Sequence, residues 1–281
     1  MRGDFKQDKR LFEIFQNALT SLSRSLGSVC GMGQFKLTAI AVIPARWAST
    51  RFPGKPLAEI AGEPMITHVI RRAAAANLIS EVVVATDDRR IAEASVAAGA
   101  IAVMTGDCRS GTDRVAEAVI DRSGWDLVVN VQGDEPLLSA RNIDLLVEGM
   151  ASTPRVAMGT LCRPLPADRH DDPNAVKVVR ALDRRALYFS RSAIPFRRET
   201  VHQQERALLH LGIYAFTRVG LQTFVGLEPS PLEEMESLEQ LRALENGMDI
   251  LVLDAIDEAI GVDTPEDLQR VERILAMQMK E

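Results

Sequence analysis

Residues 38 to 56 read TAIAVIPARWASTRFPGKP, and the first six of them set the fold that we expect. Thr38 to Ile43 are β-branched or alanine and show no polar alternation. This pattern is typical of a strand that is buried on both faces of a parallel sheet. Pro44 removes a backbone donor and ends the hydrogen-bond ladder of the strand. We therefore expect an early strand that lies centrally in an α/β sheet.

The loop after this strand carries groups that suit a polyphosphate. Its candidate nucleotide-binding residues, beside a glycine that permits close approach of the backbone, are Arg46, Ser49, Arg51 and Lys55. In open α/β sheets ligands bind just beyond the carboxyl ends of the strands, where this loop falls. A solvated charged loop is the alternative. Neither GxxxxGK[ST] nor GxGxxG follows the strand, so the sequence favours neither a P-loop ATPase nor a dehydrogenase.

The composition is that of an ordinary globular chain. Its 281 residues are 46% apolar and 26% charged, enough for one large α/β domain or two small ones. A formal net charge of -6 argues against nucleic acid as a partner, since nucleic-acid-binding proteins normally present a basic face. No apolar run has the length of a membrane helix, and the three cysteines lack zinc or disulfide spacing. We therefore expect a cytoplasmic protein with no membrane partner.

The first 36 residues differ from the rest. We interpret residues 1–36 as an N-terminal extension, helical or disordered, and residues 37–281 as the main domain. Residues 5–26 have the apolar spacing of a short amphipathic helix, and GSVCGMG at residues 27–33 is typical of a flexible joint. Acidic residues argue against a transit peptide. A translation start at Met32 and a genuine appended helix both remain open.

Strands alternate with helices as far as residue 131. The predicted strands cover residues 81–86, 100–104 and 126–131, and the predicted helices cover residues 64–77, 89–98 and 112–122. Asp87 and Asp88 can cap the second of these helices. This alternation indicates right-handed βαβ units. The expected fold is a Rossmann-like, three-layer α/β/α sandwich with a mostly parallel sheet.

The alternation of predicted strands and helices ends beyond residue 155. Predicted strands at residues 156–165, 175–182, 186–190 and 208–216 have little helix between them, so we expect antiparallel pairing. Because exposed sheet edges need covering, this small extension is the predicted homodimer interface. A helix over residues 232–246, a strand over 249–254 and a last helix capped by Thr264 complete the chain.

Two carboxylates are candidate ligands for Mg²⁺, the cofactor that we expect. Asp134 of VVNVQGDEP follows a buried strand, and Mg²⁺ prefers one or two carboxylates beside phosphate and water oxygens. Asp263 of GVDTPED precedes a helix that Thr264 already caps, which leaves its carboxylate for another partner. The alternatives are a plain acidic turn at Asp134 and a helix-dipole contact at Asp263.

Further polar candidates lie along the chain. Ser110 and Arg114 of SGTDR begin a helix whose amides suit an anion or a base edge, unless Ser110 is only a cap. His210 and Tyr214 of HLGIYAF share one face of a strand, as a core pair or as a site. Glu239 equally fits a surface helix position. The remaining candidate is Arg191 of YFSR, whose guanidinium suits a carboxylate.

Together these segments resemble the CMP-sugar synthetases, and within them the branch that activates 3-deoxy-manno-octulosonate (Kdo). The loop ARWASTRFPGKPL carries the resemblance to the family as a whole. The segments that narrow it to the 3-deoxy-manno-octulosonate cytidylyltransferases are VNVQGDEP, NAVKVV, YFSRSAIPF, HLGIY, SPLEEMESLEQLR and GVDTPEDL. The resemblance covers residues 37 to 281 and implies a nucleotidyltransferase fold.

The resemblance also assigns roles to the candidates. Asp134 and Asp263 match the magnesium ligands, and Ser110 and Arg114 match the cytidine contacts. The implied sugar-acid pocket contains His210, Tyr214 and Glu239, with Arg191 for the carboxylate of Kdo and Gln132 for either substrate. The implied catalytic set, which neutralises the triphosphate and positions the reactants, is Arg46, Arg51, Lys55 and Asp134.

The implied reaction transfers CMP from CTP to the anomeric hydroxyl of Kdo and releases pyrophosphate. Its product, CMP-Kdo, would serve lipopolysaccharide biosynthesis. Two other hypotheses stay open at this point. The acceptor could be 8-amino-Kdo or another 2-keto sugar acid, or the chain could be a nucleotide-binding regulator without turnover.

Overall fold

The computed structural model describes residues 37–48, 52–196, 198, 207–258, 260–262 and 264–278. The predicted extension at residues 1–36 lies outside the described residues. So do three predicted site residues, Ser49, Arg51 and Asp263.

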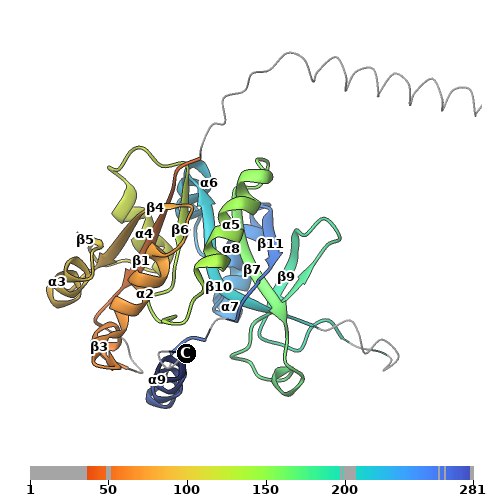
Figure 1. Cartoon of the computed structure of the whole chain (residues 1–281). Coiled ribbons are helices and arrows are strands. Elements are labelled where there is room, and N and C mark those ends of the chain that lie inside the picture. The colour runs from red at the N-terminus through yellow and green to blue at the C-terminus, as the bar shows by residue number, and fades with distance from the viewer. Residues whose placement is uncertain are drawn as a thin grey trace, which may run out of the picture. The chain divides into compact units, whose positions relative to one another are not determined.

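A parallel sheet forms the first half of the described chain (Figure 1). Its strands, in the order in which they lie side by side, are β6 (Leu127–Asn130), β1 (Ala39–Ala45), β4 (Ile79–Thr86) and β5 (Ile101–Met104). Ala41 and Ile43 of β1 pack into one apolar cluster, and Ile40 and Val42 pack into another on the opposite face. The prediction of an early, central strand with two buried faces is confirmed. The predicted end at Pro44 is wrong, because Pro44 and Ala45 still pair with β4.

Helices cover both faces of this sheet. On one face the apolar cluster takes in side chains of α2 (Met65–Ala74), α3 (Arg89–Ala97) and α5 (Ala140–Ser152). The cluster on the other face includes side chains of α4 (Gly111–Val119), α6 (Arg218–Val225) and α8 (Gln240–Glu245). In Figure 1, α2 and α5 cross in front of the strands. The three-layer α/β/α prediction is confirmed.

One long antiparallel strand joins the two halves of the sheet. This strand, β10 (Leu208–Thr217), pairs with β6 on one side and with β7 (Met158–Pro164) on the other, and β11 (Ile250–Asp254) continues the sheet beside β7. The start of β10 also pairs with β8 (Lys177–Arg180), which pairs in turn with β9 (Ala186–Ser190). The small antiparallel extension is therefore β8 and β9, and β10 itself lies inside the main sheet.

The last helix covers a small hairpin that follows the phosphate-loop candidate. The elements involved are η1 (Lys55–Leu57), β2 (Glu59–Ile60), β3 (Glu63–Pro64) and α9 (Pro265–Gln278). Ile60 and Val271 are fully buried in one cluster between hairpin and helix. The Ala61 amide also donates to Glu272 Oε1 at 3.2 Å. The C-terminal helix thus supports the segment directly after Lys55.

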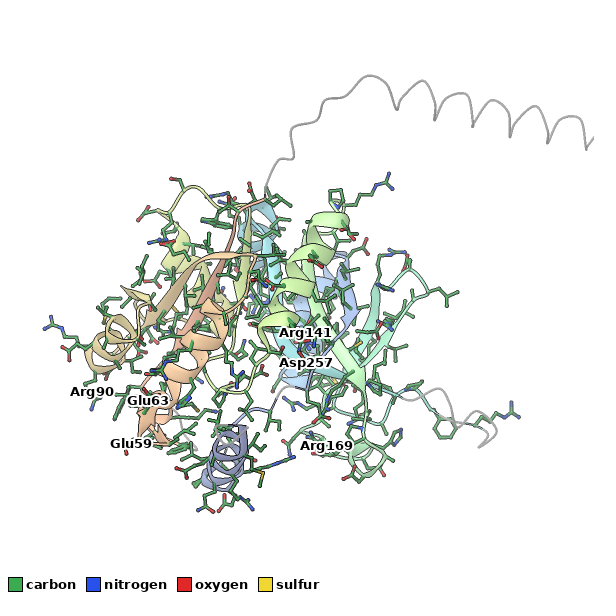
Figure 2. The ribbon with its side chains drawn as sticks, viewed as in Figure 1. Glu59, Glu63, Arg90, Arg141, Arg169 and Asp257 are labelled. Carbon is green, nitrogen blue, oxygen red and sulfur yellow. The ribbon has the colours of Figure 1, made fainter. Side chains whose placement is uncertain are left out.

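A buried asparagine fixes the chain after β11. Asn142, in α5, accepts from the Ile256 amide and donates from Nδ2 to the Asp257 carbonyl, both at 2.9 Å. The Asp257 carboxylate lies 3.5 Å from the Arg141 guanidinium, and Figure 2 shows the two side chains together. These contacts lead the chain from β11 toward α9.

Several local predictions are confirmed and others are wrong. Asp88 caps α3, and Thr264 and Asp267 form the reciprocal bonds of a capping box at α9. The predicted helix over residues 232–246 is instead two helices, α7 (Pro231–Glu236) and α8, because Ser237 adopts a left-handed conformation with φ 51°. The sequence analysis also missed α5 and α6, as well as the short η2 (Ala167–Arg169).

No helix in the described part of the chain is long and apolar enough to cross a bilayer.

Candidate active site

The loop after β1 is shaped by a contact between glycine and tryptophan. Gly54 has φ 71°, and its amide donates to the Trp47 carbonyl at 3.1 Å. A Cβ at Gly54 would come within 2.7 Å of the Trp47 indole. The indole also contacts Arg90, whose guanidinium carbon lies 3.4 Å from a ring centroid. Only glycine fits here, and its position sets that of the next residue, Lys55.

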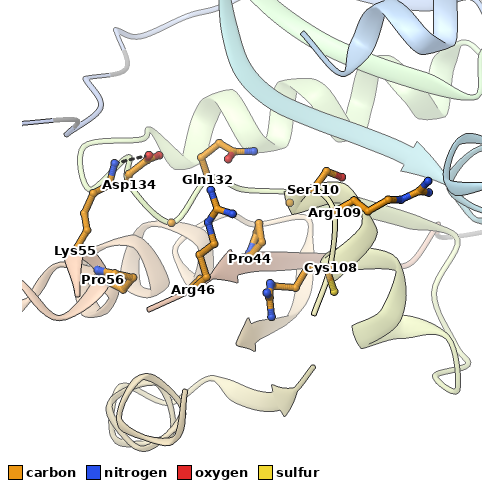
Figure 3. Close-up of a pocket in the computed structure, with 13 residues that line it drawn as sticks. Pro44, Arg46, Lys55, Pro56, Cys108, Arg109, Ser110, Gln132 and Asp134 are labelled. Carbon is orange, nitrogen blue, oxygen red and sulfur yellow. Dashed lines mark hydrogen bonds and ion pairs between the residues drawn. The ribbon is translucent and has the colours of Figure 1, made fainter. Parts of the chain in front are cut away.

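Lys55 reaches across to the end of the neighbouring strand. Its Nζ donates to Asp134 Oδ2 at 2.7 Å, which ties the loop after β1 to the loop after β6 (Figure 3). A second close approach lies beside this pair, since a Cβ at Gly133 would come within 2.9 Å of the Pro44 carbonyl oxygen. The two loops therefore meet backbone to backbone where the parallel strands end.

A cavity of about 330 Å³ opens between these loops and the start of α4 (Figure 3). The described residues that line it include four cations and a single carboxylate, namely Arg46, Lys55, Arg109, Arg114 and Asp134. Ser110 and Gln132 also line the cavity, so the structure brings together every described residue that was predicted to bind the nucleotide. The excess of positive charge suits a polyphosphate.

Arg114 is engaged within the protein. Its side chain is buried, and it donates to Asp87 Oδ2 at 3.0 Å and to the Thr105 hydroxyl. Asp87 Oδ1 also accepts from the Trp47 amide at 3.2 Å. Arg114 thus links the ends of β4 and β5 to the loop after β1. Its predicted contact with cytidine stays a prediction.

A second cavity, of about 450 Å³, adjoins the first. It is lined by all five residues that were predicted to bind the sugar acid, namely Gln132, Arg191, His210, Tyr214 and Glu239. They come from the loop after β6, from β10, and from the ends of β9 and α7. Gln132 and Asp134 line both cavities. The structure therefore places the two sets of candidates next to each other.

Two neutral ring side chains form one wall of this second cavity. Their centroids, those of His210 and Tyr214, are 5.5 Å apart. Burial lowers the pKa of His210 to about 3, so the ring is neutral at pH 7, and its Nε2 lies 2.9 Å from the Thr160 hydroxyl. Burial also raises the pKa of Tyr214, whose hydroxyl donates to Gln240 Oε1 at 3.0 Å. Both rings present polar atoms without charge.

Two further acidic side chains, besides Asp134, line the same cavity. Glu239 Oε1 accepts from the Thr112 hydroxyl at 2.6 Å, and burial raises the pKa of Glu239. Glu135 was not predicted as a site residue. Its Oε2 is buried without a hydrogen-bond partner among the described residues, although the residue as a whole is half-buried. Burial, and then the charge of Asp134, raise the pKa of Glu135 to about 8. The only sequence signal for Glu135 was its place beside Asp134.

Arg191 is held rigidly at the edge of the second cavity. Its guanidinium donates to three backbone carbonyls, those of Pro173, Glu236 and Ser237, at 2.7 to 3.3 Å. Lys177, which is fully buried, donates to the Arg191 carbonyl at 2.7 Å. The bidentate contact with a carboxylate that was predicted for Arg191 stays a prediction.

The carboxylates of this region suit a hard cation that takes only one or two ligands from the protein. Among the described residues no three His, Cys, Asp or Glu side chains gather into one cluster. Mg²⁺ does not need such a cluster, because it keeps several waters and takes one or two carboxylates together with phosphate oxygens. The Asp134 side chain, whose Oδ2 pairs with Lys55, is 36% exposed where the two cavities meet. This donor set fits Mg²⁺.

The chain is similar to curated and solved proteins over most of its length. The family model described as "Cytidylyltransferase" matches residues 40–250. A relative from Anaeromyxobacter sp. (strain Fw109-5) is 52% identical over 237 residues, which are 84% of this chain and 96% of the relative. Another relative, from Geobacter sulfurreducens, is 51% identical over 243 residues, which are 82% of this chain and 96% of the relative. Both are named 3-deoxy-manno-octulosonate cytidylyltransferase.

A solved structure of the CMP:2-keto-3-deoxy-manno-octonic acid synthetase complexed with CTP superposes with a TM-score of 0.81 and 43% identity. The match covers 86% of this chain and 99% of that one. A cytidylyltransferase from Leptospira borgpetersenii, with a TM-score of 0.57 and 17% identity, shares the fold. The chain belongs to the cytidylyltransferase family, among the 3-deoxy-manno-octulosonate cytidylyltransferases.

Proposed function

We propose that the protein transfers CMP from CTP to the anomeric hydroxyl of Kdo and releases CMP-Kdo and pyrophosphate. The observation that carries this proposal is a pair of adjoining cavities that meet at Gln132 and Asp134. One is cationic, and the other is lined by neutral and acidic polar groups with Arg191 at its edge. The names of the relatives and the CTP complex of the similar structure support the same substrates.

The cationic cavity suits the triphosphate. Arg46 and Lys55 line it from the loop after β1, and the Ser110 end of α4 adds amide donors with the positive end of a helix dipole. These groups would neutralise the charge that builds on the leaving pyrophosphate. We include Arg51 and Ser49 in this triphosphate site on the basis of the sequence alone.

The second cavity suits a sugar acid. Arg191 at its edge provides positive charge for the carboxylate, and the neutral His210 and Tyr214 offer hydrogen-bonding groups for hydroxyls. Because Gln132 and Asp134 border both cavities, the anomeric hydroxyl would lie close to the α-phosphate. Positioning of this kind supplies much of the rate in a direct displacement.

We further propose Mg²⁺ as the cofactor, with Asp134 as a ligand and Asp263 as the second ligand predicted from the sequence. When bound, Mg²⁺ would neutralise phosphate charge and lower the pKa of the attacking hydroxyl. Lys55 keeps the Asp134 carboxylate in place through their ion pair. The lipopolysaccharide role and the cytoplasmic location expected from the sequence remain part of this proposal.

Pyrophosphate release from the purified protein tests the function. The assay contains Mg²⁺ and Kdo with CTP, ATP, GTP or UTP, and then CTP with Kdo, 8-amino-Kdo or sialic acid. We expect release with CTP and Kdo. Turnover with another acid but not with Kdo would show that the acceptor is that acid and that the reaction is still cytidylyl transfer. CTP binding without turnover on any acid would favour a nucleotide-binding regulator.

A further inference from the structure

A line of hydrogen bonds, buried at its centre, runs from Gln132 to Glu239. Gln132 Nε2 donates to Asn130 Oδ1 at 3.4 Å, and Asn130 Nδ2 donates to Thr112 Oγ1 at 3.1 Å. The Thr112 hydroxyl then donates to Glu239 Oε1 at 2.6 Å. Thr112 and Asn130 are fully buried. All three bonds point the same way and end on a carboxylate, an arrangement in which each bond strengthens the next.

The line connects the two cavities. Gln132 borders both, and Glu239 lines the cavity proposed for the sugar acid. Thr112 stands in the first turn of α4, directly after the Ser110 and Gly111 positions that line the nucleotide cavity. The Ser110 side chain caps this helix by accepting from the Asp113 amide at 3.1 Å. The start of α4 therefore borders the nucleotide on one side and holds Glu239 on the other.

Glu239 depends on this support because its own helix gives it none. It is the N-cap residue of α8 but makes no side-chain cap bond there, and the chain just before it is turned by the left-handed Ser237. The hydrogen bond that Glu239 accepts from Thr112 comes from a fully buried hydroxyl. Removing this hydroxyl would leave the Asn130 amide and the Glu239 carboxylate without that partner.

We infer that Thr112 is a positioning residue for the transfer reaction, which it serves by fixing the Glu239 carboxylate toward the sugar acid from the start of the helix that borders the nucleotide. The inference rests on the proposed function.

Thr112→Val keeps the shape of the side chain and removes the hydroxyl, and Thr112→Ser restores the hydroxyl. The matched control is Thr67→Val, because Thr67 is also a buried threonine but lies in α2 on the opposite face of the sheet. Pyrophosphate release is measured with Kdo varied at saturating CTP, and then with CTP varied at saturating Kdo. Thermal unfolding confirms that each variant is folded.

We expect Thr112→Val to raise KM for Kdo by about tenfold or more, since two buried polar groups lose their partner, while KM for CTP changes by less than about twofold. Thr112→Ser should return KM for Kdo to within about threefold of the wild type, and Thr67→Val should leave both constants unchanged. On a Glu239→Gln background, Thr112→Val should add little, because the two residues act through one contact.

An unchanged KM for Kdo in Thr112→Val, or an equal rise in both KM values, would overturn the inference while leaving the function intact. Wild-type protein that releases no pyrophosphate from CTP and Kdo would contradict the proposed function, and the inference would fail with it. If Thr112→Val does not fold, Thr112→Ala, which also lacks the hydroxyl and adds no atom, is measured in its place with the same expected split between the two KM values.

Discussion

Asp134 is the single side chain on which the proposed chemistry depends most. It borders both cavities and pairs with Lys55. Asp134→Asn keeps the size of the side chain but removes its charge, so we expect kcat to fall by about a hundredfold or more with the fold intact. Pyrophosphate release at saturating Mg²⁺ measures the loss, and unchanged thermal unfolding is its control. Near wild-type turnover would refute the role of Asp134.

His210 should make stability depend on pH in a definite window. Its pKa is lowered to about 3 in the folded protein, against about 6.5 in the unfolded chain. Between these two pH values the unfolded chain binds a proton at His210 that the folded protein does not bind. His210 therefore has no effect on the pH dependence of stability above about pH 6.5, and it lowers the free energy of unfolding as the pH falls below that value. His210→Gln should remove a slope of up to about 1.4 kcal/mol per pH unit there. Urea unfolding at pH 4.5, 5.5 and 7.5 tests this, and parallel curves for both proteins would contradict it.

Gly54 and Gly62 separate two costs of adding a Cβ. Both have positive φ, but a Cβ at Gly54 also meets the Trp47 indole, whereas a Cβ at Gly62 meets nothing within 4 Å. Gly62→Ala should cost about 1 kcal/mol of stability from its positive φ alone, and Gly54→Ala should cost more, because its Cβ also meets the indole. Gly54→Ala should in addition raise KM for CTP severalfold, because it displaces Lys55. Equal effects on KM in the two variants would show that the indole contact does not set the loop.

Helix α9 makes a prediction at the level of one element. Val271 is fully buried against the hairpin after Lys55, whereas Met277 of the same helix is 68% exposed. Val271→Ala should cost about 1 to 3 kcal/mol, and Met277→Ala less than about 0.5 kcal/mol. Denaturant unfolding compares the two. Similar small losses would mean that α9 contributes little to the stability of the domain.

The sequence predicted elements well where the signal was local. The buried strand before Pro44, the cap at Asp88 and the box at Thr264 all depend on residues close together in the chain. Helix α5 had a local signal too, in the capping Ser139 and its apolar spacing, and was overlooked. The break between α7 and α8 was not predictable in this way, since an ordinary serine adopts φ 51° there.

Most polar residues that line the two cavities could be named from the sequence, with Arg109 and Glu135 among the exceptions, but the contacts between them could not. The loops that carry Lys55 and Asp134 follow adjacent strands, so their meeting follows from parallel topology. Thr112 and Glu239 are 127 positions apart, and no pattern in the sequence joins them. Likewise, the sequence could not show that the guanidinium groups of Arg114 and Arg191 donate hydrogen bonds to other groups of the protein.

For the molecule as a whole we propose a homodimer through the extension formed by β8 and β9. Large apolar side chains on and beside it, Leu182, Leu187 and Phe196, are exposed in the single chain. Leu187→Arg should convert a dimer to monomers, because a charge would be buried without a partner. Ile120→Arg, at an exposed position in the main domain, is the control. Light scattering after gel filtration measures the molar mass of each protein in solution. A wild type with the mass of a monomer would contradict the proposal.

The shared border of the two cavities has a consequence for inhibition. Because Gln132 and Asp134 belong to both, a single compound that joins a cytidine nucleotide to a sugar acid by a short linker could fill both cavities without crossing bulk solvent. Once one half is bound, the other half is present at an effective concentration of roughly millimolar. Such a tethered pair would gain affinity from geometry alone, with no new contact to the protein.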